Sequence, residues 1–304
     1  MLIAAFSVLL TFATSVKAAY VTLQSRTETP LSTEELFSWA PYTQFARAAY
    51  CPPSKLTNWT CGEACSALPG FEPTLVGGDG NAVQIFFVGF YPAKNTIVVA
   101  HQGTDPNQLL PILTDLDLVM TPLDRSLFPG IPLFTLALVH DGFRRAHERT
   151  ASKILPEVKR LMDAHGTKSL TLVGHSLGGA LAELDSLFFA LNIPKASIEA
   201  VTYGTPRVGN SVFAKLIDDK VPNFRRINNK KDVVPIVPDT SLGFMHPKGE
   251  VHIVSPGHAF ACSGNENNMD PNCTIAAVPN IFAGNTNDHN GPYEGIRIGT
   301  QHCT

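Results

Sequence analysis

A strand, a sharp turn and a helix follow one another in residues 169–184, SLTLVGHSLGGALAEL. The run SLTLVG is typical of a buried strand, and residues 176–191 have the small and apolar side chains of a packed helix. At the turn, Ser176 stands in a Gly-X-Ser-X-Gly pattern. A serine there is either a nucleophile on a strained backbone or a part of ordinary strand–helix packing. The strand before it and the helix after it favour a nucleophile.

The rest of the chain alternates between strand-like and helix-like segments, without internal repeats or a long linker. This alternation predicts an α/β fold, in which helices flank a central, mostly parallel sheet, within a single domain over residues 19–304. Ligands bind such sheets at the carboxyl ends of the strands, where Ser176 lies. The expected strands are 83–90, 96–101, 198–204 and 224–228, and the expected helices are 142–165, with a possible break at Pro156, and 211–219.

Composition and charge narrow the class of protein. The chain has 304 residues, of which 44% are hydrophobic and 16% charged, as in ordinary globular proteins. A formal net charge of −3 gives no indication of binding to nucleic acid or to an anionic membrane surface. No apolar stretch after residue 18 is long enough for a transmembrane segment. Nothing suggests a metal ion or an organic cofactor, and we expect a monomer.

Residues 1–18, MLIAAFSVLLTFATSVKA, resemble a secretory signal peptide. They are apolar up to Lys17, and small residues stand three and one positions before a cleavage site between Ala18 and Ala19. A buried helix or a membrane anchor is the alternative. The signal peptide predicts a secreted, extracellular protein.

An even number of cysteines in an exported chain indicates disulfides, although six cysteines allow 15 pairings. Two pairs are close in sequence and suggest local bridges, which leaves one bridge between the start and the end of the domain. A zinc site is the alternative, but the spacings of zinc motifs are missing. Two sequons, at Asn58 and Asn272, are candidate glycan sites, the second of them doubtful if Cys273 is bridged. The resulting pairs are Cys51–Cys303, Cys61–Cys65 and Cys262–Cys273.

A nucleophilic serine needs a base, which an acid orients, and in α/β hydrolases the order along the chain is serine, acid, histidine. Asp232 directly follows the strand-like segment at 224–228, where a loop can direct a carboxylate across the sheet edge. Asp239 is the second candidate. The acids that the pattern places within or at the end of a helix are Asp185, Asp218 and Asp219.

His289 is the first candidate for the base. It lies in the polar loop GNTNDHNGPY, close to Cys303, whose bridge would stiffen the segment. His258 competes with it. We expect His140 to pack at a helix entrance and the remaining histidines to be structural, namely His246, His252 and His302.

The oxyanion of a tetrahedral intermediate needs preorganised hydrogen-bond donors. The backbone N–H of Leu177, directly after the nucleophile, is one candidate. The other is Thr104, which follows a strand in VVAHQGTDP and offers an amide and a hydroxyl together. An ordinary glycine-containing loop is the alternative for this segment.

Together these motifs resemble the fungal class 3 triacylglycerol lipases, a secreted family of filamentous fungi, over residues 45–304. The resemblance rests on VHDGF, VGHSLGGALAEL, TYGTPRVGN, RRINNKKDVVPIVP, the C-terminal histidine and the cysteine spacing. It implies the α/β-hydrolase fold and the three disulfides named above. It also implies Ser176 as nucleophile, Asp232 as orienting acid, His289 as base, and Thr104 with Leu177 as the oxyanion hole.

One departure from the family concerns the oxyanion loop. The family often has an aromatic residue, arginine, glycine and serine or threonine there, whereas this chain has His101-Gln102-Gly103-Thr104. The donors at Thr104 survive the change. How the loop is anchored stays open.

An apolar cluster follows the oxyanion loop, in a segment that should be polar if it were permanently exposed. It is either a small helix packed into the core or, as in the family, a lid over residues 105–117 that covers the site in water and turns toward lipid at an interface. Asp105 and Pro106 are a plausible hinge and helix start. The cluster consists of Leu109, Leu110, Ile112 and Leu113.

Three functions remain open. The first is a lipase that hydrolyses water-insoluble acylglycerols at a lipid–water interface, with interfacial activation by the lid. The second is an esterase of the same fold that acts on soluble esters, including feruloyl esters. The third is a secreted binding protein that has lost catalysis, which the filled triad positions disfavour.

Overall fold

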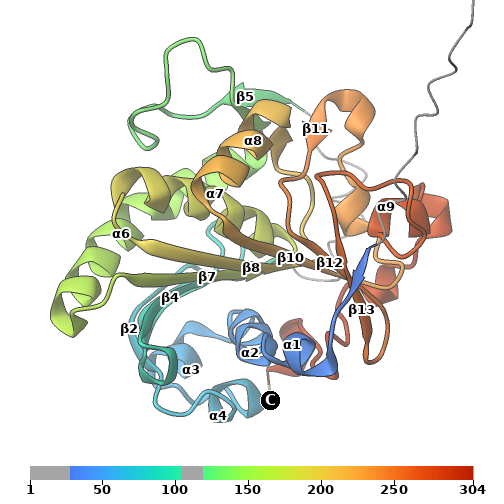
Figure 1. Ribbon diagram of the computed structural model, residues 1–304. Coiled ribbons are helices and arrows are strands. Elements are labelled where there is room, and N and C mark those ends of the chain that lie inside the picture. Colours follow the sequence, from blue (N-terminus) through green and yellow to red (C-terminus); the bar gives the residue numbers. More distant parts are fainter. Residues whose placement is uncertain (1–27, 105–118, 304) are drawn as a thin grey trace, which may run out of the picture.

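The computed structural model describes residues 28–104 and 119–303 (Figure 1). The signal peptide predicted at residues 1–18 lies outside this range, as does the predicted lid at 105–117 with Leu109, Leu110, Ile112 and Leu113. Within the described residues, every helix is too short or too polar to cross a membrane.

A nine-stranded sheet forms the centre of the molecule (Figure 1). In spatial order its strands are β1 (Thr29–Pro30), β13 (His258–Cys262), β12 (Glu250–Ser255), β10 (Asn223–Asn229), β8 (Ser197–Tyr203), β7 (Ser169–His175), β4 (Thr96–His101), β3 (Phe86–Tyr91) and β2 (Glu72–Gly77). The middle strands, from β12 to β4, run parallel. The strands at both edges are antiparallel. The predicted mostly parallel α/β sheet is therefore confirmed.

Helices cover both faces of this sheet, with α6, α7 and α8 on one face and α1 to α4 on the other (Figure 1). The α-helices are α1 (Thr33–Phe37), α2 (Ala40–Ala48), α3 (Pro53–Thr57), α4 (Glu63–Ser66), α6 (Asp141–His165), α7 (Leu177–Asn192), α8 (Ser211–Lys220) and α9 (Thr274–Ala277). Short 3₁₀ helices are η1 (Pro92–Lys94), η2 (Val234–Ile236), η3 (Thr240–Leu242), η4 (Ile281–Ala283), η5 (Thr286–Asp288) and η6 (Thr300–His302).

The central strands are apolar on both sides, because each face of the sheet packs against helices. In β4, Val98 and Ala100 belong to the core beneath α1 to α4. The alternate residues Ile97 and Val99 belong to the core beneath α6 to α8. This follows from the two-residue repeat of a strand, and a strand buried on both faces has a continuous apolar sequence.

The possible break at Pro156 does not occur, because α6 continues through this residue to His165. Proline lacks an N–H, so the carbonyl of Ser152 loses its partner in the helix. Both Ser152 and Pro156 are exposed, so water can bind that carbonyl. Ile154 and Val158 are buried and hold the helix against the sheet on either side of the proline.

A second, four-stranded sheet lies beside α8 and was not expected from the sequence pattern (Figure 1). Its strands, in spatial order, are β11 (Phe244–Met245), β9 (Gly209–Asn210), β6 (Leu138–His140) and β5 (Met120–Pro122). Each strand has only two or three residues. Such short segments have no detectable apolar repeat and depend on pairing with distant parts of the chain.

Three disulfides close loops of very different lengths. They join Cys51 to Cys303, Cys61 to Cys65 and Cys262 to Cys273, with sequence separations of 252, 4 and 11 residues. The structure thus contains the pairs expected from the sequence. The longest bridge connects the segment after α2 with the last described residue, so the strands of the central sheet from β2 to β13 lie between its two ends.

Removing the Cys51–Cys303 bridge by a double alanine substitution should lower the free energy of unfolding by about 4–5 kcal/mol, because the bridge closes most of the chain. The matched control removes Cys61–Cys65, whose two cysteines have a sequence separation of only 4, and should have less than half of this effect. Both can be measured by equilibrium unfolding in denaturant. Equal losses for the two double variants would show that loop entropy does not determine the contribution of the long bridge.

Candidate active site

Ser176 occupies the turn between β7 and α7, at the carboxyl end of a central strand. Its φ of 59° and ψ of −128° place a non-glycine residue in a sparsely populated backbone region. Such a conformation costs about 1–3 kcal/mol and is most frequent at functional sites. The residue is only 2% exposed. The turn therefore holds a strained, enclosed serine at the edge of the sheet where ligands bind.

The two glycines around Ser176 allow three backbone segments to meet. A Cβ on Gly174 would lie 2.0 Å from the carbonyl oxygen of Gly178. A Cβ on Gly178 would lie 2.2 Å from the carbonyl oxygen of His101, at the end of β4. Any larger side chain would push these segments apart. The Gly-X-Ser-X-Gly pattern is therefore a requirement of packing at this turn.

Asp232 and His289 form a buried hydrogen-bonded pair, although they lie 57 residues apart in the sequence. Asp232 Oδ2 is 2.9 Å from His289 Nδ1, and Asp232 Oδ1 accepts a hydrogen bond from the N–H of Val234 at 2.9 Å. A carboxylate can only accept, so the hydrogen of a neutral His289 lies on Nδ1. Its Nε2 then carries a lone pair that can accept a proton.

Asp232 and His289 lie next to Ser176, at the carboxyl ends of the central strands. The N–H of Ser176 donates to the carbonyl of Tyr203 at 2.9 Å. A Cβ on the next residue, Gly204, would lie 2.7 Å from Asp232 Oδ2 and 2.9 Å from His289 Nδ1. His289 Nε2 is buried and has no hydrogen-bond partner within the described residues. The hydrogen bond between a catalytic serine and its base is often long in enzymes without substrate.

Two further residues bind the backbone carbonyl of His289 and a third supports one of them, and none of these contacts was expected from the sequence. Tyr50 hydrogen-bonds His175 Nδ1 at 2.7 Å, and His175 Nε2 lies 2.8 Å from the carbonyl oxygen of His289. Tyr293 donates to the same oxygen at 2.9 Å. Burial, and then the neighbouring His289, hold the pKa of His175 well below its usual range. His175 is therefore neutral and donates through Nε2. The only sequence signal was the position of His175 beside Ser176.

The other acidic candidates serve different local contacts. Asp239 caps η3 by accepting from the N–H of Ser241 at 2.8 Å. Asp218 accepts from the N–H of Lys248, and Asp219 pairs with Lys215 on the surface of α8. Each is bound to a partner away from His289. Asp185 is buried within α7 and binds two histidines.

The remaining histidines also have other partners or positions. His140 caps α6, because its Nδ1 accepts from the N–H of Phe143. His246 and His252 are buried and hydrogen-bond backbone carbonyls. His258 is exposed at the start of β13, and His302 lies in η6 near the C-terminus. Among the described histidines, only His289 forms a hydrogen bond with Asp232.

The loop after β4 lies directly against the Ser176 turn. A Cβ on Gly103 would come within 2.9 Å of Ser176 Cβ and 2.4 Å of the carbonyl oxygen of His175. Gln102 anchors the loop, because its N–H donates to the carbonyl of Ile85 at 2.8 Å and its side chain accepts from the N–H of Ile85 at 3.1 Å. Thr104, which follows Gly103, is buried. Gln102 therefore anchors the loop at the position where the family often has an arginine.

Leu177 is the first residue of α7, so its N–H has no partner within the helix. Helix N-termini favour negative charge, since their free N–H groups and dipoles point outward. The loop that carries Thr104 and the helix start that carries Leu177 thus meet on either side of Ser176. The arrangement can stabilise an oxyanion that forms on a carbon attached to Ser176 Oγ.

Thr104→Val should lower kcat by about 10²- to 10³-fold, because it removes the hydroxyl of the residue predicted to bind the oxyanion while the volume of the side chain is kept. Steady-state hydrolysis of a soluble short-chain ester measures this effect. Thr104→Ser retains the hydroxyl and serves as the matched control, with kcat close to that of the parent. A loss below about threefold for Thr104→Val would assign Thr104 to loop structure alone.

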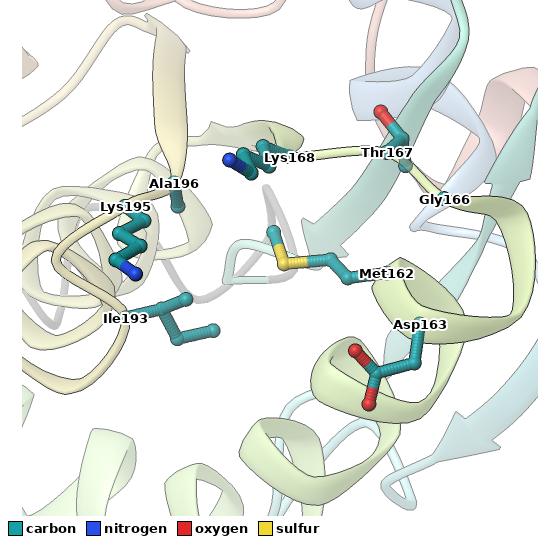
Figure 2. A pocket seen from close by; sticks show the side chains of 8 residues that line it. All are labelled: Met162, Asp163, Gly166, Thr167, Lys168, Ile193, Lys195 and Ala196. Atoms are coloured by element: carbon teal, nitrogen blue, oxygen red, sulfur yellow. The ribbon is translucent and has the colours of Figure 1, made fainter.

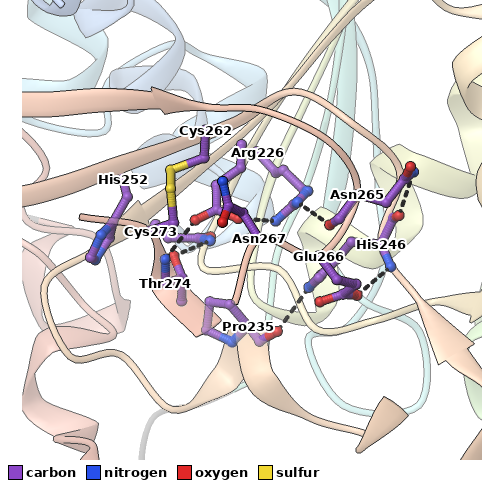
Figure 3. A network of polar contacts seen from close by, with 12 residues as sticks. Arg226, Pro235, His246, His252, Cys262, Asn265, Glu266, Asn267, Cys273 and Thr274 are labelled. Atoms are coloured by element: carbon purple, nitrogen blue, oxygen red, sulfur yellow. Dashed lines mark hydrogen bonds and ion pairs between the residues drawn. A yellow bond between two sulfur atoms is a disulfide. The ribbon is translucent and has the colours of Figure 1, made fainter. Parts of the chain in front are cut away.

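A buried polar network holds the segment that follows Asp232 (Figure 3). Arg226, on β10, donates to the carbonyl of Pro247 at 2.8 Å and lies 3.2 Å from Glu250. His246 Nε2 hydrogen-bonds the carbonyl of Pro235, in η2, at 2.8 Å. Because η2 begins two residues after Asp232, these contacts fix the backbone that orients its carboxylate.

Arg207 also binds the backbone of the segment that follows Asp232. It donates to the carbonyls of Ile236 and Pro238 and pairs with Glu266 at 2.8 Å. Burial raises the pKa of Glu266, but the hydrogen bond from Arg207 and the nearby charges outweigh burial and hold the pKa at about 2. Glu266 therefore stays ionised, and its pairing with Arg207 persists over the whole physiological range of pH.

A surface pocket of about 360 Å³ lies away from Ser176 (Figure 2). It is bounded by the end of α6 and by the segments that lead into β7 and β8, with Lys168 and Lys195 among its lining residues. These segments precede the strands, whereas Ser176 follows β7. The pocket therefore lies at the amino ends of the strands, opposite to Ser176, and takes no part in the candidate active site.

One group of metal-type donors occurs within the described residues, namely Glu28 with Cys262 and Cys273. The two sulfur atoms are joined in a disulfide. Since metal ions bind cysteine as the free thiolate, this group does not offer a thiolate site.

Known proteins resemble this chain in sequence and in structure. Residues 98–242 match the family model of the lipases of class 3. A secreted mono- and diacylglycerol lipase of Malassezia globosa is 30% identical over 225 residues, which are 73% of this chain and 71% of that protein. A lipase of Rhizopus niveus is 29% identical over 262 residues, which are 82% of this chain but only 62% of that protein. The solved structure of lipase II from Rhizopus niveus has a TM-score of 0.77 and 27% identity, covering 91% of this chain and 100% of that one.

The structural match establishes the α/β-hydrolase fold that the sequence predicted. Within this fold, the chain belongs to the class 3 lipase family and is homologous to secreted fungal lipases. It is a lipase, a carboxylic-ester hydrolase, and the predicted family is confirmed.

Proposed function

We propose that this lipase is secreted and hydrolyses acylglycerols at a lipid–water interface, with Ser176, His289 and Asp232 as its catalytic triad. The observation that carries the proposal is the buried 2.9 Å hydrogen bond between Asp232 and His289, next to the strained turn of Ser176. The similarity to a mono- and diacylglycerol lipase supports acylglycerols as the substrate class. Triacylglycerols are the substrate that we would test first.

In the first half of the reaction, Ser176 Oγ attacks the acyl carbonyl carbon and its proton passes to His289 Nε2. The carbonyl oxygen becomes an oxyanion, to which the N–H of Leu177 and the donors of Thr104 hydrogen-bond. Asp232 keeps the imidazole oriented and stabilises its positive charge. When the intermediate collapses, the C–O bond to glycerol breaks and His289 Nε2 returns the proton to the leaving oxygen.

In the second half, water replaces the glycerol and attacks the acyl-enzyme. His289 Nε2 takes a proton from this water as the new C–O bond forms. The second tetrahedral intermediate uses the same oxyanion donors. Its collapse breaks the bond to Ser176 Oγ, which regains the proton, and releases the fatty acid. No redox step and no cofactor is needed to balance the reaction.

Exposed apolar side chains near the site support an interfacial substrate. Phe282, in η4, is 93% exposed, and its neighbour Ile281 is 52% exposed. The turn is fixed, since Asn280 accepts hydrogen bonds from two N–H groups within it. The N–H of Asn285 then binds the carbonyl of Lys231, directly before Asp232, at 2.6 Å. A lipid surface at the site can cover these side chains, which water leaves unfavourably hydrated.

The predicted lid at residues 105–117 is part of the proposal and rests on the sequence. Activity on a sparingly soluble ester should rise steeply once droplets form, because lipid binds the apolar side that the lid exposes on opening. Each of its apolar side chains contributes about 1.5–3 kcal/mol when it is fully taken out of water. Leu110→Ser combined with Leu113→Ser should flatten the rise.

Hydrolysis rates across the solubility limit measure this prediction. The control is a soluble short-chain ester, on which the double variant should act as the parent does. If the hydrolysis rate of the parent instead follows simple saturation kinetics through the solubility limit of the ester, the lid is withdrawn from the proposal. An esterase for soluble or feruloyl esters is then favoured. Labelling of Ser176 by a serine-directed phosphonate separates both enzymes from a catalytically inactive binding protein.

Secretion is supported by the three disulfides and by the secreted relatives. The predicted signal peptide at residues 1–18 would deliver a single domain over 19–304. Asn58 is exposed at the end of α3 and can carry a glycan, whereas Asn272 precedes the bridged Cys273. We further propose that the enzyme acts as a monomer.

A further inference from the structure

A buried cluster of two histidines and one aspartate includes the first residue of the oxyanion loop, His101. Asp185 Oδ2 is 2.7 Å from His101 Nε2, and Asp185 Oδ1 is 2.9 Å from His147 Nε2. All three side chains are at most 1% exposed. They come from the end of β4, from α6 and from α7, so the cluster joins three elements of the fold.

The hydrogen bonds of the cluster have a defined direction. Burial by itself raises the pKa of Asp185, but the two histidines outweigh it and hold the pKa at about 2. The ionised carboxylate only accepts, so both Nε2 atoms donate to it. Each imidazole also lies near an aromatic ring, which is Phe86 for His101 and Phe188 for His147. Asp185 thus determines the orientation of both rings.

Backbone contacts connect this cluster to the two oxyanion donors. His101 is the last residue of β4, and Thr104 follows three residues later. The carbonyl of His101 lies against Gly178, in the first turn of α7, where an added Cβ would come within 2.2 Å. Leu177 is the residue before Gly178. A shift of the His101 backbone would therefore change the separation between the loop and the helix start.

We propose that Asp185 is a positioning residue for ester hydrolysis, because its hydrogen bond to His101 holds Thr104 and Leu177 at the separation that oxyanion binding requires. This inference rests on the proposed function, since it takes Thr104 and Leu177 as the oxyanion donors. His147 has a supporting part, because it holds the other oxygen of the same carboxylate from α6. The hydrogen bond between Asp232 and His289 shares no residue with this cluster.

Asp185→Asn is the direct test. Asparagine has the shape of aspartate but presents an NH₂ group to one of the two donating imidazoles, so that ring must change its tautomer to accept, and the negative charge that binds both rings is lost. A displacement of about 1 Å in an oxyanion donor can reduce turnover by about 10²-fold. We expect kcat per titrated active site to fall about 10- to 100-fold on a soluble ester, with KM within about twofold of the parent value.

A boronic acid inhibitor gives a second readout, because it forms a tetrahedral anion on Ser176 Oγ. Its affinity should fall by the same factor as kcat in Asp185→Asn. Active sites are counted with a serine-directed phosphonate, so misfolded molecules do not enter the comparison. A purely structural role would reduce the number of active sites or the thermal stability, and would leave both readouts unchanged.

If Asp185→Asn does not fold, two variants of His101 test the same inference. His101→Gln places an amide N–H close to the position of Nε2 and should retain kcat within about fivefold, whereas His101→Met lacks a donor and should lose about 10- to 100-fold. Thr96→Val is the control, since it removes a buried hydrogen bond with Thr171 at the opposite end of β4. It should lower stability and leave kcat unchanged.

Two outcomes would overturn the inference. One is a kcat and a boronate affinity of Asp185→Asn within threefold of the parent, and the other is equal activity of His101→Gln and His101→Met. The proposed function is tested separately, by labelling of Ser176 in the parent and by inactivity of Ser176→Ala. A labelled, active parent with an unaffected Asp185→Asn variant would refute only the positioning role.

Discussion

Ser176→Ala is expected to lower kcat by about 10⁴- to 10⁶-fold, because no other group in the proposed mechanism can form the acyl-enzyme. The change removes one oxygen atom from an enclosed turn, so the fold should persist. Hydrolysis of a soluble chromogenic ester measures the loss, and circular dichroism with thermal unfolding checks the fold. His289→Ala should be similarly severe, and the double variant no worse than either single one, since the two residues act as a unit.

Ser169→Ala is the matched control for this prediction. Ser169 is the first residue of β7, the strand that ends directly before Ser176, and its hydroxyl donates to Thr96 at 3.0 Å. This variant should keep the kcat of the parent and be labelled by a serine-directed phosphonate. Retention of more than about one per cent of the parent kcat by Ser176→Ala would exclude this serine as the nucleophile.

Asp232→Asn should lower kcat by about 10⁴-fold, the loss that a wrong tautomer of the base produces in a serine triad. The N–H of Val234 binds Oδ1, so the amide nitrogen of an asparagine would occupy the position of Oδ2, beside His289 Nδ1. A donor there forces Nδ1 to accept and places the hydrogen on Nε2. The base could then no longer take the proton of Ser176.

Asp239→Asn is the matched control, since Asp239 was the second candidate for the acid. Its carboxylate caps η3, and its partner is the N–H of Ser241. We expect kcat to stay within about threefold of the parent, because the contact lies outside the proposed triad. Comparison of both variants on one soluble ester decides between the two acids. A severe loss for Asp239→Asn with a mild one for Asp232→Asn would contradict our assignment.

The sequence predicted the parts of this protein whose cause is local. The apolar run before Ser176, the glycines around it and the small residues after it demand a strand, a tight turn and a helix in this order. Alternation of such units then limits the fold to a mostly parallel sheet with helices on both faces. For the same reason the helices at α6, α7 and α8 were expected close to their observed limits.

Other elements were not predicted, because contacts with distant parts of the chain determine them more strongly than their local sequence pattern. In β12, Glu250 and His252 are buried polar residues, which find partners in Arg226 and in two backbone carbonyls. The strand therefore has no clean apolar repeat. At Pro156 the sequence suggested an interruption, yet packing of the buried face of α6 keeps the helix continuous.

The candidate site divides in the same way. The sequence by itself determined the place of Ser176 and a short choice of acids and bases, because strand ends and polar loops are local features. Only the tertiary structure decided that Asp232, and not Asp239, meets His289, since the ends of β10 and of the C-terminal loop are brought together by the order of strands. It alone also placed Asp185 between two histidines, because side chains on β4, α6 and α7 become neighbours only when those elements pack.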